Sequence, residues 1–321
     1  MIAIDRITAM GVVFGALAFL PGCGSGSTGP EQNAPTTVDE FAAVPAPPTG
    51  AVRYDFPEQV VAPGADVQTC YFMEPVAEDV FIRALDSYQS RFGHHLILFR
   101  AEKPEPVGSV RDCTSIQDMI NLMPVISSVN FGLQEFPEGM AVRVPAGTQL
   151  VLQQHIVNTS ENSIRLRDAV HVRYAPKAEV QIMAGFYGLS DVNFILPPHN
   201  QHTTNWECVV PRDMSVLLMG PHMHEWGKSF VAQAGPVDNL QTIIDIPEWR
   251  AEMRDTPPVT EYSKDAPLLL KQGDVIRTKC TWMNTTAEEL IFPYEMCATY
   301  GYYFPAPEGS EVWTCGGSQV F

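Results

Sequence analysis

Basic residues are scarce in this chain. Its 321 residues include 20 Lys and Arg against 37 Asp and Glu, for a formal net charge of -17 at pH 7. We find no local cluster of Lys or Arg that could reverse this charge, and a surface of this sign repels phosphate backbones. The composition therefore argues against nucleic acid as a partner.

The apolar run at residues 7–20 is too short for a comfortable transmembrane span. It follows Arg6 and precedes a Pro-Gly pair, as in a signal peptide, which we expect over residues 1–22. Leu20-Pro21-Gly22-Cys23 also resembles a bacterial lipobox, in which a lipid is attached to the cysteine, here Cys23. The expected product is an exported, membrane-anchored lipoprotein, periplasmic or at the cell surface. An ordinary secretory signal followed by a stray cysteine is the alternative.

Residues 24–50 are poor in large apolar side chains. They are rich in Gly, Ser, Thr, Pro and Ala, a composition that cannot bury enough surface to order itself. We therefore expect a flexible tether over residues 23–50. The rest of the chain is long enough for two domains. Apolar patterning is weakest near residues 175–178, so the expected domains are residues 51–177 and 178–321.

Long helical patterns and sequence repeats are also lacking. The 27 prolines and 23 glycines indicate many turns, and the absence of a repeat argues against a solenoid or propeller. Only residues 115–123 and 246–253 look helical. Short apolar or alternating runs bounded by turn residues instead predict strands, for example at residues 96–99, 140–144, 149–152 and 215–219. We expect an all-β fold.

No Cys-x-x-Cys metal knuckle occurs among the seven cysteines. Apart from Cys23, an even number remains, which points to disulfides in an exported chain. These cysteines are Cys70, Cys113, Cys208, Cys280, Cys297 and Cys315. About 15 pairings of six cysteines are possible, and composition does not choose among them.

A first group of histidines lies beside predicted strands. His94 and His95 precede the run at residues 96–99, and His155 ends the run at residues 150–154. Three imidazoles could therefore meet between neighbouring strands as a metal site. Consecutive strand residues face opposite ways, so His94 and His95 can share an ion only where the backbone twists or bulges. One surface histidine and one at the edge of the core is the alternative.

A second group combines nitrogen with sulfur. His222 and His224 are two residues apart, on one face of a strand and about 7 Å apart at the backbone. Met296 lies next to Cys297, which a disulfide could hold in place. A thioether beside two imidazoles selects Cu(I) over zinc, calcium or magnesium. Taken alone, a methionine is more often a core filler.

Together these stretches resemble the copper type II, ascorbate-dependent monooxygenases, the family of peptidylglycine α-hydroxylating monooxygenase and dopamine β-monooxygenase. The resemblance covers most of residues 54–315. In that family a His-His pair before an apolar strand and a later histidine after a Leu-Gln stretch bind one copper. A His-x-His followed by Gly-Lys, and a methionine within Glu-Met-Cys, bind the other. The matching residues are His94, His95 and His155 for one copper, and His222, His224 and Met296 for the other.

The resemblance also implies the fold and the disulfides. It implies two tandem jelly-roll-type antiparallel β-sandwich domains, each holding one copper. The pairings that it implies are Cys70 with Cys113, Cys208 with Cys315, and Cys280 with Cys297.

The chemistry that the resemblance implies is hydroxylation of a C–H bond. The three-histidine site would deliver an electron, and the His/His/Met site would react with O2 and substrate, with ascorbate or a similar reductant as co-substrate. Gln153 matches a glutamine near the first copper, and a hydrogen bond at the strand end is equally compatible with its position. Tyr300 matches a substrate-contacting tyrosine. Gly220 and Ala298 stand where the peptide-processing enzymes have an arginine and an asparagine, which argues against a glycine-extended peptide as substrate.

Two other functions are compatible with the sequence. A lipoprotein that stores, buffers or delivers copper would use the same ligands without turnover, whereas a structural or adhesive sandwich would bind no metal. The remaining histidines, His171, His199 and His202, are expected in solvent. Glu225 and Lys228 are expected to form a local surface pair.

Overall fold

Strands make up most of the computed structural model, which describes residues 36–319 except 129–133, 255, 293, 310 and 317. The expected signal peptide and the lipid attachment at Cys23 lie outside the described residues. The expected strands are all present, as parts of β6 (Gly93–Ala101), β10 (Met140–Val144), β11 (Gln149–Val157) and β17 (Met214–His222). The protein is all-β, with several mostly antiparallel sheets. Within the described residues, no helix has the length and apolar character needed to cross a membrane.

One five-stranded sheet carries the first group of histidines. Its order is β7 (Val110–Asp112), β4 (Asp66–Pro75), β11, β6 and β8 (Leu122–Ser128). Alternate residues of β6 and β11, such as Leu98 and Leu152, point into a core that also contains Ile82 and Val172. This core lies between the sheet and the strands β5 (Val80–Tyr88) and β13 (Ala169–Tyr174). The arrangement is sandwich-like.

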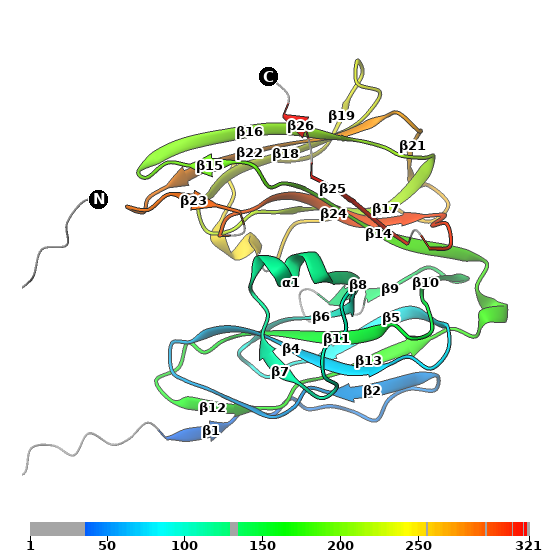
Figure 1. The fold of residues 1–321 in the computed structure, drawn as a ribbon, viewed down its shortest axis with the longest axis vertical. Coiled ribbons are helices and arrows are strands. Elements are labelled where there is room, and N and C mark those ends of the chain that lie inside the picture. The colour runs from blue at the N-terminus through cyan, green and yellow to red at the C-terminus, as the bar shows by residue number, and fades with distance from the viewer. Residues whose placement is uncertain are drawn as a thin grey trace, which may run out of the picture. The chain divides into compact units, whose positions relative to one another are not determined.

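A second five-stranded sheet covers the other core. Its order is β19 (Gln241–Ile246), β18 (Gly227–Gly235), β22 (Val275–Asn284), β16 (Asn200–Val209) and β26 (Ser318–Gln319). Figure 1 shows β16, β22 and β18 in one layer and β14 (Ile182–Asp191), β24 (Cys297–Phe304) and β17 in the next. Trp206, Phe230 and Trp282 fill the space between these layers and are buried completely.

An eleven-stranded sheet joins the two cores. Its main path is β2 (Ala51–Asp55), β13, β5, β10, β14, β24, β17 and β20 (Thr260–Glu261). Three further strands pair with it, β9 (Gln134–Glu135), β21 (Leu268–Leu270) and β25 (Val312–Cys315). The ladder runs past the expected domain boundary, because β10 pairs in parallel with β14 from Met140 and Ile182 onward.

The middle of this sheet has a core on each face. In β24, Tyr302 belongs to the core of the first histidine group and its neighbour Tyr303 to the other core. In β17, Leu218 and Met219 divide in the same way. Residues 35–321 accordingly form one compact unit.

Two small sheets complete the structure. The first contains β1 (Thr37–Asp39), β12 (Ser163–Leu166) and β3 (Gln59–Val61), and the second contains β15 (Ile195–Leu196) and β23 (Leu290–Ile291). Residues 37–39 therefore belong to a sheet, although they fall within the range expected as a tether.

The six cysteines of the described chain form three disulfides. They pair Cys70 with Cys113, Cys208 with Cys315, and Cys280 with Cys297. These are the pairings implied by the family resemblance, and they indicate an extracytoplasmic protein, because disulfides persist in oxidising compartments. The Cys280–Cys297 bridge joins β22 to β24, across the core of the second sheet.

One of the two helical expectations is confirmed in part, and the other is wrong. Helix α1 (Ile116–Asn121) begins at the cap residue Ser115, which exchanges hydrogen bonds with Asp118 as a capping box. It ends where β8 begins. Of the second expected helix, Ile246 instead ends β19, and only a 3-10 turn, η2 (Ala251–Arg254), is present. Pro247 holds Ile246 out of the helical region, and the backbone N–H of Trp249 bonds to the carbonyl oxygen of Lys228 at 2.8 Å instead of to a helical partner. A further 3-10 turn, η1 (Lys177–Glu179), lies near the expected boundary.

We predict that Gly301→Ala strongly destabilises the protein. A Cβ at this position would lie 1.8 Å from the carbonyl oxygen of Leu218 on the neighbouring strand, which cannot move without breaking the ladder. Overpacking of this kind costs about 1–3 kcal/mol or more, measurable as a lower urea midpoint with the disulfides intact. Gly316→Ala is the control, because its Cβ would meet Val192 at an ordinary 3.8 Å. Equal midpoints for the two variants would contradict the prediction.

Candidate functional site

A register shift places consecutive histidines on the same side of β6. Along the β6–β11 ladder His95 pairs with His155, but the next pair joins Gly93 to Ile156, so His94 is an extra residue. Such a bulge lets neighbouring side chains turn the same way. The ring centroids of His94 and His95 lie 5.1 and 5.0 Å from that of His155. The structure therefore brings the three predicted ligands of the first site together.

Polar neighbours hold two of these rings. The Nε2 atom of His155, which is fully buried, lies 2.6 Å from Oδ1 of Asp66 at the start of β4. Nε2 of His95 lies 3.4 Å from Oε1 of Gln153, a long contact, and the Gln153 amide also contacts Sγ of Cys113 at 3.5 Å. Carboxylate and amide partners of this kind fix the ring orientation of metal-binding histidines. Asp66 had no sequence signal, because it lies far from His155 along the chain.

The second pair of histidines converges at the end of β17. The Nε2 atoms of His222 and His224 lie 3.1 Å apart, and their rings are nearly perpendicular, at 85°. Two nitrogens that each lie about 2.0 Å from one ion can be separated by at most about 4 Å. The observed separation is therefore compatible with one shared ion.

The other nitrogen of His224 is held by the backbone. Its Nδ1 lies 3.0 Å from the carbonyl oxygen of Tyr294. A proton on Nδ1 that is donated to this carbonyl leaves Nε2 as the lone-pair nitrogen, the form in which an imidazole binds a metal. The tautomer that this contact favours thus suits a ligand.

A buried carboxylate fixes the backbone around this pair. Glu295 accepts hydrogen bonds from the backbone N–H groups of His224, Trp226 and Met296, at 3.1, 2.9 and 3.0 Å. It accepts a fourth from Nε1 of Trp282 at 2.8 Å. Burial raises the pKa of the Glu295 carboxyl above its ordinary value, and the charge of His224 and the backbone donors offset only part of that rise. The backbones of Met296 and His224 therefore share one anchor. Met296 itself is half-buried.

Trp249 also contacts this turn. Its indole nitrogen donates to the carbonyl oxygen of His224 at 3.0 Å. Gly227 makes this packing possible, because a Cβ there would lie 2.5 Å from the indole ring. Sequence reasoning missed both Glu295 and Trp249. The one available signal for Glu295 was its place next to Met296, in the Glu-Met-Cys stretch.

Tyr300 lies against the strand that carries His222. It is the strand partner of Gly220, and a Cβ at position 220 would lie 2.7 Å from Cζ of its ring. The phenol therefore occupies the space that a side chain at 220 would need. Burial raises the pKa of the Tyr300 hydroxyl, which keeps it uncharged at neutral pH. Ala298, another uncharged residue, is the strand partner of His222.

The two candidate sites differ in the donor atoms that they offer to a metal. Among the described residues, no group of three or more His, Cys, Asp or Glu side chains meets the geometric requirement for holding a metal ion. In the three-histidine group, Nε2 of His155 engages Asp66, so a metal would be bound through Nδ1 of this ring. The second group relies on the thioether of Met296 for its third donor. The chemistry of both donor sets fits copper.

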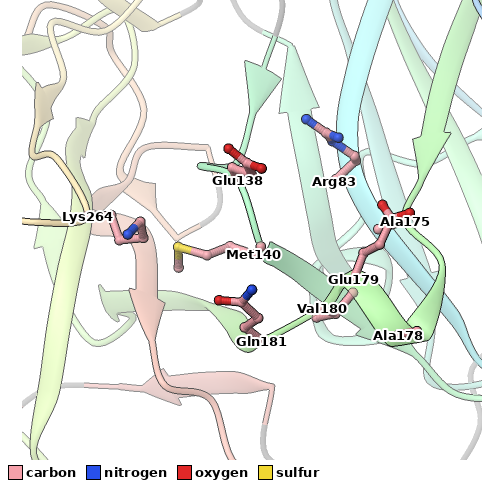
Figure 2. Close-up of a pocket in the computed structure, with 10 residues that line it drawn as sticks. Arg83, Glu138, Met140, Ala175, Ala178, Glu179, Val180, Gln181 and Lys264 are labelled. Atoms are coloured by element: carbon pink, nitrogen blue, oxygen red, sulfur yellow. The ribbon is translucent and has the colours of Figure 1, made fainter.

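A pocket of about 600 Å3 lies away from these residues. Arg83, Glu138, Met140, Gln181 and Lys264 are among the residues that line it, and Figure 2 shows their side chains. None of the predicted metal ligands lines this pocket.

Two minor expectations are wrong. His171 is completely buried in β13, where its ring packs 4.6 Å from that of Tyr88, and it is not solvated. The reason is that β13 lies between β2 and β5 in the large sheet. Glu225 pairs with Arg254 and not with the expected Lys228, because η2 brings the arginine to the turn. Of the other two histidines, His199 is exposed and His202 is half-buried.

No known protein family has a model that matches this chain, and no curated protein matches it.

We predict that Glu295→Gln destabilises the metal-free protein by about 1–3 kcal/mol, the usual cost of leaving buried polar groups unsatisfied. An amide places its own N–H donors against the four donors that now face the carboxylate. The measurement is urea unfolding. Glu207→Gln is the matched control, because Glu207 pairs with Arg277 across neighbouring strands near the surface. Loss of this ion pair is expected to lower the free energy of unfolding by about 0–1 kcal/mol. A cost for Glu295→Gln no larger than for the control would argue against this anchor.

We also predict that His171 contributes to acid sensitivity. Burial lowers its pKa from the ordinary 6.5, so the folded state binds its proton less readily than the unfolded state. The stability of the parent should therefore fall as the pH drops through about 6.5. His171→Phe keeps the packing on Tyr88 and should flatten this part of the profile in urea unfolding.

The control for that experiment is His199→Asn. His199 is exposed and has φ 51°, a conformation that asparagine tolerates. The His199→Asn variant should keep the parental slope of stability against pH. If His171→Phe also keeps the parental slope, His171 is not the sensitive group.

Proposed function

We propose that this protein is a copper-dependent monooxygenase. It hydroxylates a C–H bond of a small organic substrate with O2 and a one-electron reductant such as ascorbate. The observation that carries the proposal is the pair of His222 and His224 nitrogens, 3.1 Å apart and held next to the backbone of Met296 by one carboxylate. The assembled rings of His94, His95 and His155 support a second metal.

In this proposal the ligands form two sets. One copper is held by His94, His95 and His155, and the other by His222, His224 and Met296. Copper, when bound, supplies one-electron redox chemistry and reactivity toward O2, and a sulfur ligand favours the Cu(I) state. The sulfur-containing set is therefore the place for the oxygen reaction, and the all-nitrogen set is the electron reservoir.

The protein's own groups prepare these ligands. Tyr294 fixes the tautomer of His224 through its carbonyl oxygen, and Asp66 orients His155. The Cys280–Cys297 disulfide restrains the segment that carries Met296. Rigid positioning of this kind keeps the ligands in place when the metal changes oxidation state.

The proposal includes the finer architecture and the location of the protein. Two tandem jelly-roll-type sandwiches, residues 51–177 and 178–321, agree with the presence of two apolar cores. A lipid anchor at Cys23 agrees with the three disulfides, since both need export. The protein would then act in the periplasm or at the cell surface.

A neutral substrate agrees best with the surroundings of His222. Its strand partner is Ala298, and Tyr300 fills the space above Gly220 with an uncharged phenol. In the peptide-processing enzymes that the sequence resembles, an arginine at the position of Gly220 grips a carboxylate. The Tyr300 ring closes that space here. We therefore propose a small, uncharged organic substrate, with Tyr300 as a contact residue.

We predict about two copper ions per chain, and about one in His222→Ala and Met296→Ala. Both variants should lose oxygenation, because the sulfur-containing set is broken, while the fold and the copper of the three-histidine set remain. Metal analysis and ascorbate-driven O2 uptake with small uncharged substrates measure this. Met183→Ala is the control, because Met183 is a half-buried methionine of β14 that packs on the core of the second sheet and is not one of the proposed ligands.

Two outcomes would contradict this function. Copper binding without product-coupled O2 uptake would favour the alternative, a lipoprotein that stores or delivers copper. Zinc, or an absence of metal, in the purified protein would exclude both copper functions.

A further inference from the structure

We propose that Arg254 is a positioning residue shared by the two candidate metal sites. Arg254 ends the turn η2, and its guanidinium pairs with two carboxylates from different parts of the chain. Nη2 lies 3.5 Å from Oδ2 of Asp66, and Nη1 contacts Oε1 of Glu225. The metal part of this inference rests on the proposed function.

The first carboxylate belongs to the three-histidine site. Oδ2 of Asp66 faces Arg254, and Oδ1 of the same group lies 2.6 Å from Nε2 of His155. One side chain thus lies between the imidazole and the guanidinium. Because Asp66 engages Nε2, the His155 ring would bind a metal through Nδ1. The orientation of the Asp66 carboxylate then sets the orientation of that ligand.

The second carboxylate belongs to the turn of the His222/His224 pair. Glu225 directly follows His224, whose backbone N–H is bound by Glu295 and whose carbonyl oxygen accepts from Trp249. Residues 249–254 therefore contact this turn twice, through the indole of Trp249 and the guanidinium of Arg254. This segment reaches from the second site to Asp66 of the first.

Burial and shape explain why an arginine suits this position. The Arg254 side chain is 17% exposed, whereas Asp66 and Glu225 are 52% and 44% exposed. A planar guanidinium presents donors along two edges and can hold two carboxylates at once, while a lysine offers one point charge. Ion pairs with exposed partners add little to global stability. The expected effect of Arg254 is therefore on ligand orientation rather than on unfolding.

The test compares copper(I) affinity at each site separately. A His222→Ala background isolates the three-histidine site, and a His94→Ala background isolates the other. In each background, competition with a Cu(I) chelator is measured for Arg254→Met, Arg254→Lys, Asp66→Asn and Glu225→Gln. Arg250→Met is the control, because Arg250 lies on the same segment and pairs locally with Glu252.

A positioning residue shared by the two sites should change the copper(I) affinity of both. Arg254→Met should weaken copper(I) binding at both sites by roughly 3–10-fold, below the roughly 10–100-fold typical of removing a direct partner of a ligand. Asp66→Asn should affect the three-histidine site alone, and Glu225→Gln the other site alone. Arg254→Lys should recover part of the affinity at one site. If Arg254→Met changes only one site, or neither site more than Arg250→Met does, the proposal is wrong.

A metal-free measurement separates this inference from the proposed function. Imidazole nitrogen NMR of the copper-free chain reports the hydrogen bonds of His155 and His224 directly. Arg254→Met should shift the signals of both rings, and Arg250→Met neither. If the protein binds no copper but both rings shift, the proposed function fails and the role of Arg254 stands. If neither ring shifts, Arg254 does not position them, whatever the metal content.

Discussion

The arrangement of the second candidate site depends on the buried carboxylate of Glu295. Its four donors come from three segments, the turn after β17, the segment before β24 and the strand β22. A buried carboxylate is costly unless its lone pairs are satisfied, and here neighbouring N–H groups satisfy them. The same bonds that stabilise the charge therefore set the positions of residues 224 and 296. One set of hydrogen bonds thus both satisfies the buried carboxylate and places the candidate ligands.

Much of the fold follows from local patterns. Short apolar runs between turn residues predicted β6, β10, β11 and β17, because strand periodicity is a local property. The cysteine count predicted disulfides, but only the family resemblance chose the pairs that the structure contains. The condition for His94 and His95 to face one side was a bulge, and the register shifts at that point.

The contacts that tune the histidines could not be predicted in the same way. Asp66 lies 89 residues before His155, and Arg254 lies 29 residues after Glu225, so no local pattern connects them. Local charge reasoning paired Glu225 with Lys228, and local polarity placed His171 in solvent. Both failed because a sheet and a 3-10 turn bring in distant neighbours. The hydrogen bond from Trp249 to the carbonyl oxygen of His224 could not be predicted from the sequence for the same reason.

The strands β14, β24 and β17 carry apolar side chains on both faces, and this affects how the protein can be divided. Leu218 and Tyr302 belong to one core, and Met219 and Tyr303 to the other. A fragment that ends near residue 177 would lose part of its own core, and the complementary fragment would present Leu218 and Tyr302 to water. Exposed apolar surface of this kind promotes association. Cutting the chain near residue 177 would thus produce fragments that tend to aggregate, because the core of the first histidine group draws side chains from both sides of the cut.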